Sequence, residues 1–293
     1  MARATRSCPV LRRHAACALL ACLVLVAPGA PAAAPSVQPL VARQLAAIRA
    51  ARGPEAYAAL RELWQAWEEI DPVQVEEALT AVAEDGALGA PLRAYAGALR
   101  AHARWRRGDR QGAELAIRRL GFVTEWLVVG PFDNEGKGGL GQAFVPEQEL
   151  GEPVLLERAY QGKQRPVRWR PSPPVHPHGW LDLGALVRPR TKVCAYAATF
   201  LRQAAGTGRA AAPRQLSLWV GATGAFRLFW NEQAVLEDKS YRDLDVDRFA
   251  VAVPLEPGHN RLTVKVCADD SPPAVAVRVA EPDGSPATGI EAS

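Results

Sequence analysis

The sequence predicts a segregated α+β protein, in which helical hairpins come first and an antiparallel β-sandwich follows. Helix-breaking residues at regular intervals, together with a high content of Ala, Leu, Arg and Glu, predict helices over residues 37–120. From residue 121 to residue 282, apolar side chains alternate with a period of two between short turn signals. No segment of helical periodicity interrupts this second part of the sequence, which disfavours a parallel α/β sheet.

The first 34 residues have the features of a secretory signal peptide. Four arginines and no acidic residue precede an apolar run, and small residues from Ala30 to Ala34 follow it. The run is too short for an ordinary membrane span, with an uncleaved anchor as the alternative interpretation. Cys22 lies inside the run instead of after it, which favours ordinary cleavage near Ala32 to Ala34 over a lipoprotein site. We therefore expect an exported chain, periplasmic or extracellular, with no membrane span after cleavage.

Removal of the signal peptide changes the charge of the chain. The whole sequence has 35 Lys and Arg against 31 Asp and Glu, and the signal peptide carries four of the arginines, which leaves 31 against 31. Nucleic-acid binding usually needs a basic surface. A neutral mature chain lacks that surface, so nucleic acid is not an expected partner.

Five helices are predicted in the first part of the mature chain. Their expected ranges are 38–52, 54–70, 72–84, 91–107 and 110–119. Pro54, Pro72 and Pro91 stand where helices begin, as proline at a first helical position does. Each hairpin is expected to bury one apolar stripe against the next hairpin. The stripe of the first hairpin includes Leu60, Leu63, Trp64 and Trp67.

The second hairpin resembles a tetratricopeptide repeat. The matching residues are Ala101, the turn Gly108-Asp109 and Ala113. The sequence departs from the repeat at Gly97, Arg100 and Leu120, where the repeat prefers a large aromatic residue, a leucine and a small residue. The resemblance implies stacked helical hairpins, and a concave peptide-binding face does not follow from it. Three arginines share one face of the helix at 91–107, where they form either a partner site or a solvated face: Arg100, Arg104 and Arg107.

The second part of the chain alternates apolar and polar residues in five clear runs. The apolar positions are Leu216, Leu218 and Val220; Phe226, Leu228 and Trp230; Val251, Val253 and Leu255; Leu262, Val264 and Val266; and Val275, Val277 and Val279. Turn residues separate the runs, as at Asn231-Glu232 and Pro257-Gly258. Many short strands at such spacing predict a sandwich or barrel. Residues 283–293, which follow the last run, are expected to be a disordered tail.

The glycine-rich stretch "WLVVGPFDNEGKGGLG", Trp126 to Gly141, can be compared with two nucleotide-binding motifs. A Walker A loop would need Gly130 one residue closer to Gly136-Lys137, and Gly138 replaces the hydroxyl residue of that motif. A dinucleotide-binding loop would leave a strand directly and open a helix, whereas Pro146 interrupts the segment that follows here. We therefore expect a first sandwich strand followed by a surface loop, and no nucleotide.

Several strand-like segments resemble the successive strands of a galactose-binding-like jelly-roll module. They are "EWLVVGPFDNEGKGG", "AFVPE", "VRWRP", "KVCAYAATF", "GATGAFRLFWNEQAVLED" and "LEPGHNRLTVKVC". In exported bacterial proteins this module is joined to tetratricopeptide-type helices, and some of those proteins continue into a transglutaminase-like peptidase region. Relatives tend to have an Asp-containing turn where "GATGAF" stands and a Gly at the position of Glu232. These departures weaken the transfer of ligand binding at that turn.

The candidate ligand-binding residues are two tryptophans and two histidines. His176 and His178 lie in the loop "PPVHPHGW", where a pair of metal ligands and a solvated loop are the two interpretations. Trp180 follows this loop, and Trp219 is out of phase with its apolar neighbours, so these are the tryptophans expected to be exposed. Exposed aromatic faces beside polar groups are what sugar recognition uses.

Two further groups of residues have a structural interpretation. Asp243, Asp245 and Asp247 alternate along "DLDVDRF", where they either bind a structural calcium ion or form an exposed acidic edge. Cys194 and Cys267 remain after signal cleavage, each in a strand-like run. In an oxidising compartment they either pair as a disulfide or stay as two buried thiols.

The functional expectation from the sequence is a non-catalytic, exported binding or scaffolding protein of the cell envelope. The mature sequence has no G-x-S-x-G, H-E-x-x-H or C-x-x-C motif, so we predict neither a catalytic residue nor a cofactor, the calcium ion apart. The expected partner is a glycan or another envelope protein. The alternative is an accessory subunit of, or truncated relative of, an envelope peptidase with a transglutaminase-like region, whose catalytic region this chain is expected to lack.

Overall fold

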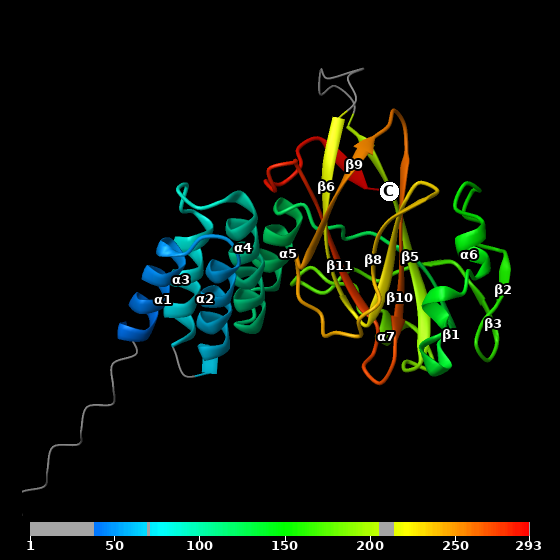
Figure 1. Cartoon of the computed structure of the whole chain (residues 1–293), viewed down its shortest axis with the longest axis horizontal. Coiled ribbons are helices and arrows are strands. Elements are labelled where there is room, and N and C mark those ends of the chain that lie inside the picture. The colour runs from blue at the N-terminus through cyan, green and yellow to red at the C-terminus, as the bar shows by residue number, and fades with distance from the viewer. Residues whose placement is uncertain (1–37, 69–70, 205–213, 293) are drawn as a thin grey trace, which may run out of the picture. The chain divides into compact units, whose positions relative to one another are not determined.

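The computed structural model describes residues 38–68, 71–204 and 214–292 (Figure 1). The predicted signal peptide lies outside the described residues. The α+β class is confirmed, since helices come first and antiparallel sheets follow. No helix in the described ranges is long and apolar enough to cross a membrane.

Five helices form the first part of the described chain. They are α1 (Gln38–Ala50), α2 (Pro54–Gln65), α3 (Pro72–Ala83), α4 (Ala90–Arg106) and α5 (Arg110–Arg119). Prolines stand in the first turns of α2, α3 and α4, and the carboxylates of Asp71 and Asp109 accept hydrogen bonds from backbone N–H groups that begin α3 and α5. The segment predicted as one helix over 54–70 leaves α-helical geometry after Gln65 and tightens into a 3-10 turn, η1 (Ala66–Glu68).

The core of the helical part lies between α1, α2, α3 and α4. Its buried members include Ile48, Leu60, Leu63, Leu79 and Tyr95. Of the predicted stripe, Leu60, Leu63 and Trp67 are buried. Trp64 is only half-buried, because it lies at the edge of this core.

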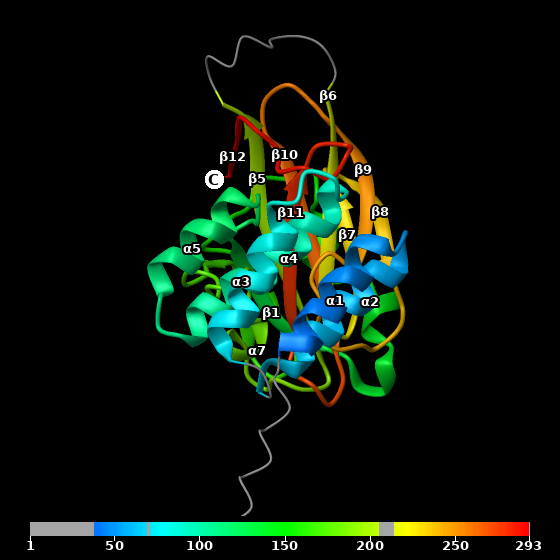
Figure 2. The ribbon, with the colours of Figure 1, turned by 90° about the vertical axis from the view of Figure 1, so that its left-hand side faces the viewer.

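Two antiparallel sheets stack to form the β-sandwich (Figures 1 and 2). The larger sheet contains β1 (Leu127–Asp133), β4 (Arg170–Pro171), β5 (Val193–Gln203), β7 (Ala225–Trp230), β8 (Gln233–Asp238), β10 (Asn260–Ala268) and β12 (Ile290–Ala292), in the order β4-β1-β5-β10-β7-β8 with β12 also on β5. The smaller sheet has the order β11-β6-β9, formed by β11 (Ala274–Ala280), β6 (Arg214–Thr223) and β9 (Phe249–Leu255). Outside the two sheets lie a hairpin, formed by β2 (Ala159–Gln161) and β3 (Pro166–Arg168), and two single-turn helices, α6 (Val145–Gln148) and α7 (Leu183–Leu186).

The alternating apolar residues fill the space between the two sheets, as predicted. In β6, Leu216, Leu218 and Val220 are fully buried there, and β10 and β11 contribute their alternate residues in the same way. In a sandwich whose outer faces met water, every second residue of a strand would be exposed. Here β10 is buried at every position, so its outer face is covered as well. Helices α4 and α5 cover the outer face of the smaller sheet at Ala276. A long loop with α6 and the β2–β3 hairpin covers the outer face of the larger sheet.

The glycine-rich stretch belongs to this covering loop. After β1 it forms two 3-10 turns, η2 (Glu135–Lys137) and η3 (Gly139–Gly141), and Phe132 is buried beneath it against Phe144. The side chain of Asn134 closes the turn, because its amide oxygen accepts a hydrogen bond from the Gly139 N–H at 3.0 Å. Gly139 has no room for a side chain, since a Cβ there would lie 2.5 Å from the Cys194 sulfur. The glycines therefore allow the loop to lie close against the sheet.

Cys194 on β5 and Cys267 on β10 are directly opposed in the sheet and are joined in a disulfide. The sequence left open either a disulfide or two buried thiols, and the structure shows the disulfide. The prediction of a disordered tail over 283–293 is wrong for residues 283–292. Ile290–Ala292 adds a strand to β5, and Gly284 accepts a hydrogen bond from the buried Arg278.

Candidate functional site

A cavity of about 250 Å³ lies where the helices meet the sandwich. Two helices and two loops line it: α2, α4, the loop that precedes α7, and the loop between β8 and β9. The lining side chains are Arg61, Trp64, Gln65, Tyr95, Ala98, Leu99, His102, His178, Trp180, Leu244, Asp245 and Val246. Among them are three large aromatic rings, two imidazoles, an ion pair and an amide.

Aromatic and imidazole rings form one wall of the cavity. The His102 ring from α4 stacks on the His178 ring from the loop, with the two ring centres 4.2 Å apart and the planes nearly parallel. The Trp180 and His178 rings meet edge to face with their centres 3.6 Å apart, and the centres of the Trp64 and His102 rings are 4.9 Å apart. Trp64, His102 and Trp180 are each half-buried, so each presents part of its ring to the cavity or to water.

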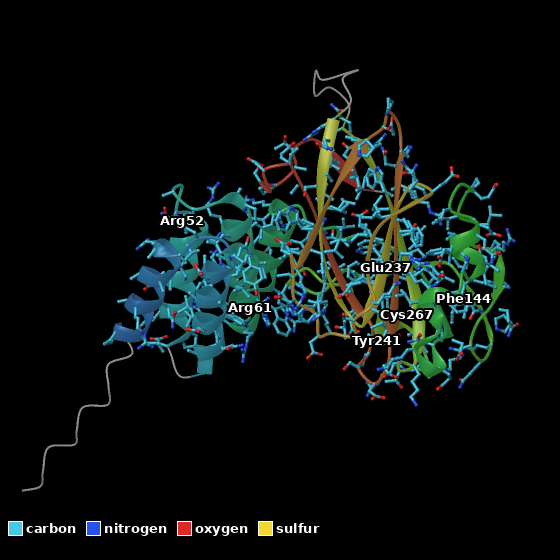
Figure 3. The ribbon with its side chains drawn as sticks, in the orientation of Figure 1. Arg52, Arg61, Phe144, Glu237, Tyr241 and Cys267 are labelled. Carbon is cyan, nitrogen blue, oxygen red and sulfur yellow. A yellow bond between two sulfur atoms is a disulfide. The ribbon has the colours of Figure 1, made fainter. Side chains whose placement is uncertain are left out.

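A second part of the cavity lining is polar and charged, and consists of Arg61, Tyr95 and Asp245. The carboxylate of Asp245 accepts a hydrogen bond from the Tyr95 hydroxyl at 2.9 Å and forms an ion pair with Arg61. Arg61 also donates from Nε to the Tyr95 oxygen at 3.2 Å. Figure 3 labels Arg61, which the helical segment contributes to this contact with the sandwich loop. The three side chains fix one another, and Arg248 approaches the same carboxylate at 3.9 Å. The Asp245 carboxylate is thereby occupied, whereas the exposed Arg61 side chain keeps part of its guanidinium for a ligand.

All three histidines near the cavity are neutral at neutral pH. Burial lowers the pKa of His102 to about 4, and the nearby charges of Arg106 and His176 act in the same direction. Burial, together with His102 and His176, lowers the pKa of His178 to about 2. The pKa of His176 is also lowered, chiefly by burial, although Asp182 opposes the shift.

His176 lies behind the cavity wall. Its ring is 3.6 Å from the His178 ring and 4.5 Å from the ring of Trp105. The Nδ1 atoms of His176 and His178 are buried and have no hydrogen-bond partner among the described residues. A neutral imidazole has one donor and one acceptor nitrogen, so His178 keeps a hydrogen-bonding atom that the protein itself does not use.

The predicted site residues fall into two groups. The structure places Trp180 and His178 in the cavity wall, with His176 beside them. Trp219, by contrast, lies on the outer face of β6 away from the cavity lining, where the guanidinium of Arg278 stacks over its ring at 5.3 Å. It is half-buried, as Trp180 is, and Arg278 covers part of its ring.

The three aspartates do not converge on a calcium ion. Asp243 is exposed, Asp245 belongs to the cavity cluster, and Asp247 is buried against Arg278. Within the described residues, no group of three His, Cys, Asp or Glu side chains is placed to hold a metal ion, the three histidines included. The alternation of the aspartates did not reveal this, because the segment is a loop in which successive carboxylates point to different partners.

Sequence reasoning missed most of the cavity. Arg61, Trp64 and Gln65 are spaced as one face of α2, and Tyr95, Leu99 and His102 as one face of α4. These spacings were visible in the sequence. Nothing in it showed that both faces would meet the loop of His178 and Trp180.

The sequence matches no protein-family model and no curated protein. One solved structure to which the chain has a distant likeness is described as a PA14 sugar-binding domain from an RTX adhesin. The identity is 13%, the match covers 54% of this chain and 88% of that chain, and the TM-score is 0.26. A likeness at this TM-score supports no conclusion about this chain.

Proposed function

We propose that this chain is an exported, non-catalytic binding protein and that the cavity between helices and sandwich recognises a carbohydrate. A single observation carries the proposal: the half-buried rings of Trp64 and Trp180 line the same small cavity as the Arg61–Asp245 pair. A sugar ring has an apolar face of C–H groups and a rim of hydroxyls. Aromatic rings pack against the apolar face, while charged and amide side chains form hydrogen bonds with the hydroxyls.

The chemistry of the cavity favours binding over catalysis. A catalytic imidazole is held by an orienting hydrogen bond, whereas His178 Nδ1 has no partner among the described residues. The Asp245 carboxylate is already engaged by Arg61 and Tyr95. The two cysteines of the expected mature chain form a disulfide, so neither sulfur is a free nucleophile. Export of the chain is an expectation from the sequence alone.

A glycan array followed by calorimetric titration of the best sugar tests the proposal. We expect Trp180→Ala and Trp64→Ala to raise the Kd by about tenfold or more, which corresponds to at least about 1.4 kcal/mol of lost binding energy. Trp219→Ala is the matched control, because that tryptophan lies outside the cavity lining. Circular dichroism and thermal melts establish that each variant is folded. The proposal is overturned if no glycan binds, or if the cavity variants bind as well as the control.

A further inference from the structure

A second hollow lies on the helical part, away from the proposed sugar site. It has a volume of about 280 Å³ and is bounded by α4, α5, the end of α3 and the turn at Ser285-Pro286. Its apolar surface comes from Ala94, Gly97, Leu115, Ala116 and Leu120. We call it the α4–α5 groove.

Glycine at position 97 lets the side chain of Leu120 pack closely against α4. A Cβ atom there would lie 3.1 Å from a methyl carbon of Leu120, so even a small side chain would crowd the floor. The tetratricopeptide pattern prefers a large aromatic residue at this position, whereas here the Leu120 side chain fills the space beside Gly97. The floor of the groove is therefore formed by small and aliphatic residues.

The rim of the groove is strongly basic. Four arginines line it, namely Arg93, Arg100, Arg104 and Arg119, against a single acidic residue, Glu84. Arg100 pairs with Glu84 at 3.0 Å, and Arg104 pairs with Glu76 at 3.0 Å.

The other two arginines of the rim are not neutralised in this way. Neither Arg93 nor Arg119 forms a side-chain hydrogen bond or an ion pair with any residue that the structure describes. The charge of Arg93 makes only a small contribution to the lowered pKa values of Asp85 and Asp283, whose main causes are hydrogen bonds to the backbone N–H of Ala87 and to the Ser285 side chain. Asp85 is already paired with Arg49, and Asp283 is exposed, so that solvent screens its charge. The Nε atoms of Arg93 and Arg100 are buried and find no hydrogen-bond partner within residues 38–68, 71–204 and 214–292. An excess of positive charge and unused donors therefore surrounds an apolar floor.

We infer that the α4–α5 groove binds an acidic peptide segment that places an aliphatic side chain on the floor and carboxylates against the arginines. Guanidinium groups bind carboxylates through paired, charge-assisted hydrogen bonds. A sugar acid is the less suitable ligand, because the part of the chain that the structure describes places no aromatic ring in this groove to receive a sugar face. The peptide would come from a partner protein of the envelope, and its site is separate from the proposed sugar site.

Fluorescence anisotropy with a synthetic probe tests this inference. The probe is a dye-labelled pentapeptide with one leucine between two glutamates on each side, and its lysine counterpart is the specificity control. We expect the acidic probe to bind, the lysine probe not to bind, and the affinity to fall as salt is raised. Arg119→Glu should weaken binding by about tenfold or more, and Leu115→Ser should weaken it without a change in charge. Both residues are exposed, so neither substitution threatens the fold.

Arg118→Glu is the matched control, since Arg118 neighbours Arg119 on α5, is also exposed, and does not line the groove. It carries the same change in net charge. Equal weakening by Arg118→Glu and Arg119→Glu would overturn the inference by showing only diffuse attraction. Absence of binding by the acidic probe would overturn it too, as would preference for an oligogalacturonate over the peptide. Sugar binding at the other cavity is measured with the same variants and is expected to be unchanged.

Discussion

The guanidinium of Arg278 on β11 donates a hydrogen bond of 2.7 Å to the carboxylate of Asp247, and both side chains are almost completely buried. Arg278 also donates to the Gly284 carbonyl at 3.0 Å and lies over the ring of Trp219. These contacts join the loop before β9, the outer face of the smaller sheet and the turn after β11. A buried charge pair of this kind fixes one arrangement, because either charge alone would be costly to bury.

Asp247→Asn should lower the free energy of unfolding by about 3–5 kcal/mol, since it leaves the Arg278 charge buried and unpaired. Asparagine suits the test because residue 247 has a φ of 56°, a left-handed conformation that asparagine tolerates. Urea denaturation measures the loss. The double variant Asp247→Asn with Arg278→Met should recover part of it. A loss below about 1 kcal/mol in the single variant would contradict the assigned role of the pair.

Acidification should destabilise the junction of helices and sandwich through the histidine cluster. In the unfolded chain histidine takes up a proton near pH 6.5, whereas in the folded chain His102 does so only near pH 4 and His178 near pH 2. Between the folded-state and unfolded-state pKa values, the unfolded state binds more protons than the folded state. The stability that the two histidines contribute is therefore fully present well above pH 6.5 and is lost progressively as the pH falls through and below that value. The decline reaches at most about 1.4 kcal/mol per pH unit for each histidine.

Urea midpoints measured between pH 7 and pH 5 isolate this effect from most carboxylates, which titrate at lower pH. His102→Gln and His178→Gln should each flatten the pH dependence of the midpoint. His259→Gln, in an exposed turn, is the control and should leave it unchanged. A midpoint that does not change over this pH range in the unmodified protein would refute the assignment.

The sequence allowed the interior of the sandwich to be predicted but not its outer faces. Leu218 and Val264 face inward because strands alternate, and that pattern is local. The same pattern assigns Lys265 and Arg278 to solvent, although both are fully buried. Only the complete fold shows that a loop covers one sheet and helices cover the other.

The candidate site shows the same limit. His178 and Trp180 were predicted from one short loop, where aromatic and imidazole side chains are conspicuous. Arg61, Tyr95 and Asp245 come from three distant segments, and each is ordinary in its own segment. Their chemistry exists only because α2 and α4 dock against the loop before β9. A spacing rule within one segment cannot supply such a contact.

Removal of the disulfide should destabilise the sandwich without changing its fold. The bridge joins Cys194 and Cys267 across a sequence separation of 73 residues. A loop of this length corresponds to about 4 kcal/mol in the chain-entropy treatment of disulfides. Cys194→Ala with Cys267→Ala should therefore unfold at lower urea concentration while the far-ultraviolet circular dichroism at low urea is retained. Treatment of the unmodified protein with reductant should give the same shift, and resistance to both would contradict a stabilising role.

Lys265 should control how firmly the glycine-rich loop lies on the larger sheet. From β10 its ammonium group donates to the carbonyls of Leu140 at 3.2 Å and Gln142 at 2.6 Å, and it pairs with Glu147 at 2.9 Å. Lys265→Met removes all three contacts and leaves the two loop carbonyls without their donor, while Glu147 keeps its ion pair with Arg227 at 2.8 Å. We expect a loss of about 3 kcal/mol in stability and faster hydrogen exchange confined to residues 138–148.

Lys239→Met is the control for this prediction, because the side chain of Lys239 is 81% exposed. Its effect on stability should stay within about 0.5 kcal/mol, and loop exchange should not change. Unchanged exchange in the Lys265→Met variant would show that the buried Phe132 and Phe144 hold the loop without the lysine. Acceleration of exchange in the loop alone, with β5 and β10 still protected, would establish that the ammonium group holds the loop. It then donates hydrogen bonds to loop carbonyls that the glycines bring too close to the sheet to be hydrated.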